Sequence, residues 1–166
     1  VFVRSAIARG HIRQIEVEAA RAAPNIIAVL TADDTARDNI SNMVWTGSPV
    51  RDDGLTGVES QRPLLSSSVI RHLGEPICMI VGRTRQSAMD AAELINISYE
   101  ADQEVALTLG ELKGPLVWPE SPDNIASLHV LGDKVAVEAA IDMSAHEVHL
   151  DFDISKVAAC PIEMRS

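Results

Sequence analysis

Residues 77–100, with the sequence ICMIVGRTRQSAMDAAELINISYE, decide the fold class of this chain. The apolar run Ile77–Gly82 has the length and composition of a strand that is buried on both faces. Thr84 can cap the helix that follows, which we expect to extend to about Ile95 and to pack through its alanines. Ile95–Glu100 then alternates apolar and polar residues, as a half-buried strand does. This strand–helix–strand unit predicts a domain of mixed α and β structure.

The N-terminal part of the chain adds further short elements of both kinds. Val1–Val3 is a short β-prone run, and His11–Val17 reads as a strand that leads into one or two helical turns over Glu18–Ala23. Ile26–Leu30 is a continuous apolar run of strand length, and Thr31 can cap a short helix behind it. These segments favour an α+β fold.

Residues 38–62 are rich in Asn, Ser, Gly and Pro and predict a long loop. Long loops of this kind are uncommon in compact domains and are usually functional or docked on another surface, so we interpret this one as an indication of a missing partner surface. Regular structure is expected to resume with a short strand over Val69–Leu73.

The C-terminal part reads as the beginning of a second domain. Residues 101–123 form a connector whose second half is rich in proline, so we expect one domain over residues 1–121 and an incomplete one over 122–166. Gly132-Asp133 can cap a helix over Lys134–Ile141. Glu147–Ser155 alternates apolar and polar residues and predicts a strand with one apolar face.

Charge and composition exclude several classes of protein. Lys and Arg total 14 against 24 Asp and Glu, a net charge of −10, and only five side chains are aromatic. Nucleic-acid binding needs clustered basic and stacking aromatic side chains, so it is not expected. No apolar run reaches the ~20 residues of a membrane span. Cys78 and Cys160 form no disulfide framework, which predicts free thiols and a cytoplasmic location. The start at Val1, inside an apparent strand, predicts a fragment or a subunit piece.

Each candidate for chemistry has a simpler structural interpretation. Cys78 lies in an apolar strand where thiols are usually inert, and Cys160 is the better candidate for reactivity, although a structural role is favoured for it too. Gly74-Glu75-Pro76 would project a carboxylate from a kink, or place it to accept nearby N–H groups in a turn. An anion could lie at the helix start near Thr84 and Arg85, but an ordinary capped helix is favoured.

One further cluster could suggest a metal site. Its residues are two apart on one strand face, about 6.5 Å from each other, which gives too few convergent ligands. A solvated strand face is the favoured interpretation. The cluster and its neighbours are His146, Glu147, His149, Asp151 and Asp153.

The order of short motifs resembles the large subunit of the molybdenum hydroxylases, the family of xanthine dehydrogenase, aldehyde oxidase and aerobic carbon monoxide dehydrogenase. The match covers essentially the whole chain, and the form of its last residues resembles the carbon monoxide dehydrogenase branch more than xanthine dehydrogenase. The segments that carry the resemblance are Phe2–Ser5 with His11-Ile12, Ala28–Asp34, Arg62–Leu65, Gly74–Pro76, Ala88–Glu100, Asn124–Ala126, Gly132-Asp133 and Pro161–Ser166.

The resemblance implies an α/β-hammerhead domain followed by the opening segment of a molybdenum-cofactor-binding domain. It further implies a fragment of an oxidoreductase large subunit that acts as scaffold and subunit interface, is inactive alone, and contains no catalytic, cofactor-binding or metal-binding residue. The intact enzyme would use molybdopterin cytosine dinucleotide or a related molybdenum cofactor. Its partners would be the remainder of the large subunit and iron–sulfur and FAD subunits or domains, with self-association as a further option.

Several points stay open from the sequence. The substrate and the subfamily are undecided because the substrate-contacting residues of the family lie beyond Ser166, and a role for Glu75 or Glu163 is neither assigned nor excluded. The alternative is a stand-alone binding or assembly module, a truncated paralogue without catalysis.

Overall fold

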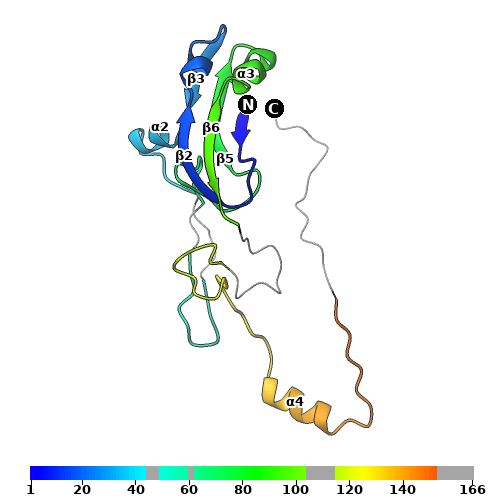
Figure 1. Cartoon of the computed structure of the whole chain (residues 1–166). Helices are drawn as coiled ribbons and strands as arrows, with labels where there is room; N and C mark the ends of the chain where they lie inside the picture. Colours follow the sequence, from blue (N-terminus) through cyan, green and yellow to red (C-terminus); the bar gives the residue numbers. More distant parts are fainter. Residues whose placement is uncertain (44–48, 60–61, 104–114, 153–166) are drawn as a thin grey trace. The chain divides into compact units, whose positions relative to one another are not determined.

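The computed structural model describes residues 1–43, 49–59, 62–103 and 115–152. The chain divides into two compact units, Val1–His129 and Val130–Ser166. Within the described residues, the first unit contains two three-stranded sheets whose neighbouring strands are all antiparallel (Figure 1).

The first sheet is built around the apolar run that decided the fold class. Its order is β1 (Phe2–Arg4), β5 (Pro76–Gly82) and β3 (Ile26–Leu30). Ile77 and Ile80 of β5 are buried, as expected for a central strand without polar alternation. The prediction of a buried strand here is confirmed.

The second sheet has the order β4 (Val69–Ile70), β2 (Gly10–Glu16) and β6 (Asn96–Ala101). Strands β2 and β6 pair along their whole length, with an irregularity in register in the middle of β2. Gly10 has a φ of 149°, and a Cβ there would lie 2.3 Å from the carbonyl oxygen of Glu100. Only glycine therefore allows the two strands to approach at this end.

Three short helices connect these strands: α1 (Glu18–Arg21), α2 (Ala32–Arg37) and α3 (Arg85–Ala92). Helix α2 begins with a capping box between Thr31 and Asp34. Helix α3 buries Ala88 and Ala91, whose small side chains allow close packing, and it ends before the expected Ile95.

The core of the first unit gathers buried side chains from both sheets and from α1 and α3. Ile70, from β4 of the second sheet, belongs to the same cluster as the β5 residues of the first sheet. Both sheets are thus joined through one apolar core. The buried members are Val17, Ala20, Val29, Ile70, Ile77, Cys78, Ile80, Ala88 and Ala91.

The predicted strand Val69–Leu73 is shorter than expected, since β4 ends at Ile70. The backbone N–H groups of Arg71 and His72 donate to the carboxylate of Glu75 instead of joining a sheet. A side-chain acceptor therefore replaces the strand partner at this point.

In the second unit, helix α4 (Lys134–Asp142) begins as predicted, with the Asp133 side chain accepting from the N–H of Ala136. The predicted strand Glu147–Ser155 is wrong for its described part, because residues 147–152 have no strand assignment. Within the described residues no ladder supplies the hydrogen bonds that a strand requires. No described helix is long and apolar enough to cross a membrane.

Candidate functional site

The most constrained polar group near the sheets is the carboxylate of Glu75, which is 3% exposed. Oε1 accepts from the Ser66 hydroxyl at 2.6 Å, and Oε2 accepts from the backbone N–H of Arg71 at 2.6 Å and of His72 at 3.4 Å. Gly74 precedes it with a φ of 79°, a conformation that favours glycine.

The backbone around Glu75 also joins two distant parts of the chain. Its carbonyl accepts from the N–H of Ser5 at 2.8 Å, and the N–H of Gly74 donates to the carbonyl of Ser5 at 3.0 Å. The expectation of a turn whose carboxylate accepts nearby N–H groups is confirmed. With both carboxylate oxygens engaged, the geometry fits a structural role for Glu75.

A second buried polar cluster, which we name the Arg51 clasp, consists of Arg51, Asp53, Asp123 and the carbonyl of Ile125. The Arg51 side chain is only 2% exposed. Its Nη1 and Nη2 donate to the two oxygens of Asp123 at 2.8 and 2.7 Å, and Nη1 also donates to the Ile125 carbonyl at 2.9 Å. Its Nε and Nη2 donate to Asp53. Two bidentate pairs thus share one guanidinium.

The clasp shifts the ionisation of its carboxylates. Hydrogen bonding from Arg51 lowers the pKa of Asp123 from 3.8 to about 2 and holds the pKa of Asp53 below its ordinary value. Hydrogen bonds from the same carboxylates raise the pKa of Arg51. All three groups are therefore charged at neutral pH.

Backbone bonds extend the clasp in both directions. The N–H of Asp52 donates to Leu128, the N–H of Leu128 donates to Val50, and the N–H of Val58 donates to Ala126. The described part of the loop over residues 38–62 thus docks on a segment of the same chain. The units divide after His129, eight residues beyond the predicted boundary at 121, and the domain assignment itself stays a prediction.

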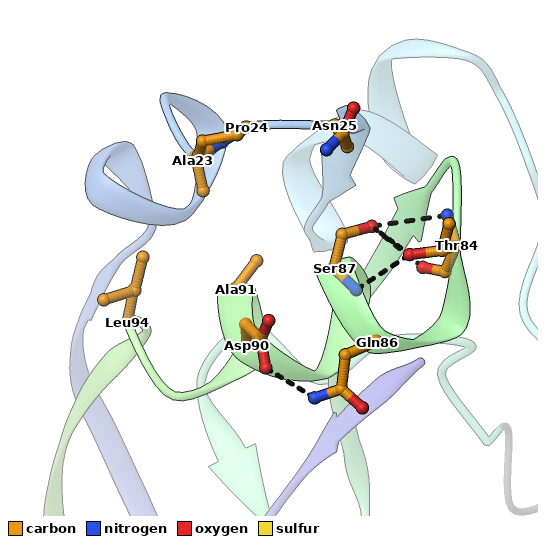
Figure 2. A pocket seen from close by; sticks show the side chains of 9 residues that line it. All are labelled: Ala23, Pro24, Asn25, Thr84, Gln86, Ser87, Asp90, Ala91 and Leu94. Carbon is orange, nitrogen blue, oxygen red and sulfur yellow. Dashed lines mark hydrogen bonds between the residues drawn. The ribbon is translucent and has the colours of Figure 1, made fainter.

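The start of helix α3 borders an open depression of about 450 Å³, shown in Figure 2. Thr84 Oγ1 accepts from the N–H of Ser87 at 3.1 Å, and Ser87 Oγ accepts from the N–H of Thr84 at 3.3 Å. The described residues that line the depression include Asp90 and no basic side chain. The expectation of an ordinary capped helix is confirmed, and nothing in the lining favours an anion.

The remaining candidates also take simple structural positions. Cys78 is fully buried, and burial raises the pKa of its thiol to about 11, as expected for an inert thiol. His149 contacts Glu147 at 2.9 Å on an exposed segment. No group of three His, Cys, Asp or Glu side chains among the described residues could hold a metal ion. Asp153, Cys160 and Glu163 lie outside the described residues.

Comparison with known proteins places this fold. The family model "aldehyde oxidase and xanthine dehydrogenase, a/b hammerhead domain" matches residues 1–103. The chain belongs to this family. The hammerhead match therefore spans both three-stranded sheets and helices α1–α3.

Individual relatives agree with the family assignment. The chain is 28% identical over 177 residues to the nicotine 6-hydroxylase large subunit of Paenarthrobacter nicotinovorans, covering 99% of this chain and 19% of that protein. Carbon monoxide dehydrogenase from Oligotropha carboxidovorans aligns with a TM-score of 0.66 at 25% identity, over 88% of this chain and 18% of that one. Quinoline 2-oxidoreductase from Pseudomonas putida 86 aligns with a TM-score of 0.59 at 31% identity, over 69% and 14%. The chain spans less than a fifth of the length of these relatives.

Proposed function

We propose that this chain supplies the hammerhead domain of the large subunit of a molybdopterin-dependent oxidoreductase, and that it serves there as scaffold and subunit interface. The observation that carries the proposal is the family match over residues 1–103, in a chain that spans 19% or less of its relatives. The two polar clusters support it, since both fix the fold and leave no activated side chain.

The donor chemistry of the described residues does not fit a molybdenum cofactor. The Glu75 carboxylate is engaged by three donors, the two aspartates of the Arg51 clasp are occupied by one guanidinium, and burial disfavours the thiolate of Cys78. We therefore derive no catalytic step for these residues. In our proposal the cofactor, molybdopterin cytosine dinucleotide or a relative of it, is held by the remainder of the intact large subunit.

The second unit supports an interface role. Its described residues expose large apolar side chains, including Val135 and Ile141 of α4 and Phe152 beyond it. Exposed apolar surface of this kind marks a contact with another surface. The remainder of the large subunit is the partner that we propose for it, and iron–sulfur and FAD subunits or domains would complete the enzyme and accept electrons from it.

The test is to purify the chain alone, measure molybdenum by elemental analysis, and assay oxidation of aldehydes, purines and carbon monoxide with a dye acceptor. We expect no bound molybdenum and no turnover. Stoichiometric molybdenum together with turnover would refute the scaffold role. Mass spectrometry of the natural protein separates the alternative, since a mass equal to that of these 166 residues supports a stand-alone module.

A further inference from the structure

Arg71, unlike several arginines of the first unit, has no acidic partner among the residues that the structure describes. Arg9, Arg37 and Arg51 each form an ion pair with an aspartate. The guanidinium of Arg71 lies instead over the ring of Trp118, 4.0 Å from its centroid. Its Nε is buried without a hydrogen-bond partner in that part of the chain. Buried polar atoms nearly always have a hydrogen-bond partner, so the unpaired Nε–H of Arg71 indicates a missing acceptor.

The surroundings of Arg71 form a polar depression of about 260 Å³ in the first unit. Ser67, Ser68 and Asn42 contribute to its lining, which includes no acidic side chain among the described residues. Hydroxyl and amide groups, like the guanidinium, can donate hydrogen bonds to an oxyanion. The Glu75 carboxylate, which accepts from the backbone N–H of Arg71, is also held by the Ser66 hydroxyl and by the N–H of His72.

We propose that this depression, which we name the Arg71 pocket, binds a single oxyanion. The contact with the Trp118 ring restricts the guanidinium, whose planar fork of N–H groups suits a planar or tetrahedral oxyanion. The ligand is either a free anion such as phosphate or a carboxylate side chain of a contacting protein, and both present the same oxygen chemistry. This proposal does not depend on the proposed scaffold role. The guanidinium of Arg71 takes part in neither of the two clusters that support that role, the Glu75 contacts and the Arg51 clasp.

The negative net charge of the chain helps to distinguish binding of an anion at a specific site from general attraction to the surface. A net charge of −10 repels anions from the surface in general, so an anion that binds saturably must find a local site. Arg83 is an exposed arginine of the same unit. It does not line this depression, and it stacks on no aromatic ring among the described residues. It provides the matched control for non-specific attraction.

The test follows the side-chain Nε–H signal of Arg71 and the indole N–H signal of Trp118 by NMR, while phosphate or acetate is added to the whole chain. We expect saturable shifts at both groups and none at Arg83. Arg71→Gln should abolish binding, Arg71→Lys should weaken it by about tenfold because the planar fork is lost, and Arg83→Gln should leave it unchanged. Trp118→Leu should also weaken it, by removing the ring that holds the guanidinium.

The outcomes separate the two sources and can overturn the site. Binding of phosphate but not of acetate assigns a free anion, whereas binding of acetate at similar strength assigns a carboxylate side chain. Absence of saturable shifts in the wild-type chain overturns the proposal, and so do equal shifts at Arg83 or retained binding in Arg71→Gln. The wild-type titration decides the matter even if a substituted chain fails to fold, and no outcome depends on molybdenum or on turnover.

Discussion

Replacement of Glu75 by alanine should destabilise the first unit strongly. The change removes two short hydrogen bonds to a charged acceptor, from the Ser66 hydroxyl and the Arg71 N–H, each 2.6 Å long. Hydrogen bonds to charged groups contribute roughly 1.5–3 kcal/mol each, and relief of the desolvation of the carboxylate offsets part of the loss. We therefore expect the free energy of unfolding to fall by about 2–5 kcal/mol, a large share of the roughly 5–15 kcal/mol of a typical domain.

The measurement is equilibrium urea unfolding followed by far-UV circular dichroism. Glu75→Gln should cost less than Glu75→Ala, since its amide oxygen can still accept from the N–H of Arg71 while its NH₂ group donates to the Ser66 oxygen. Ser66→Ala should also cost less than Glu75→Ala, because it removes one bond only. Glu120→Ala, at an exposed glutamate, is the control and should change stability by less than about 0.5 kcal/mol. A loss below about 1 kcal/mol for Glu75→Ala would refute the structural role that we assign to the carboxylate.

Three further predictions concern the Arg51 clasp, the buried thiol and the chain boundary. The pKa of Asp123 in the folded chain, about 2, lies below its ordinary value of 3.8. The contribution of this carboxylate to stability is therefore complete above pH 4 and is lost as the pH falls toward 2. Asp123→Asn should remove this pH-dependent loss from an acid unfolding profile measured by circular dichroism. In a Cys160→Ser background, iodoacetamide at pH 8 should alkylate Cys78 at least about a hundredfold faster in urea than in the folded chain, as followed by mass spectrometry. A chain ending at His129 should unfold cooperatively, and light scattering should show less self-association than for the full chain. A chain ending at Ser121 lacks Asp123, so the Arg51 clasp is broken and the chain should become sensitive to protease around residue 51.

Local sequence patterns predicted the sheet strands well because their signals lie within a few residues. The run Ile77–Gly82 has no polar position that could face water, so a central strand was the natural expectation. The cap at Thr84 depends only on Ser87, three residues later. Elements of this kind follow from the chain itself, without knowledge of what packs on them.

The Arg51 clasp could not be predicted in the same way. Arg51 and Asp123 are 72 residues apart, and no spacing rule joins an arginine in one loop to an aspartate in a distant connector. The only sequence signal was the length of the loop over residues 38–62, which we interpreted as an indication of a missing partner surface, whereas its described part docks on this chain itself. The structure identifies that surface as residues 123–128 of the same chain.

The segment after α4 was predicted as a strand from its local pattern, and its described part is not one. The alternation beginning at Glu147 predicts a strand with one apolar face, but a strand exists only when another backbone accepts and donates its hydrogen bonds. Val148, Leu150 and Phe152 are 82%, 72% and 80% exposed, although burial of such side chains is worth roughly 1.5–3 kcal/mol each. A sequence that maintains this apolar face encodes a contact that the described residues do not supply. In the function proposed above, the remainder of a large subunit would supply that contact, and the relatives extend far beyond the length of this chain.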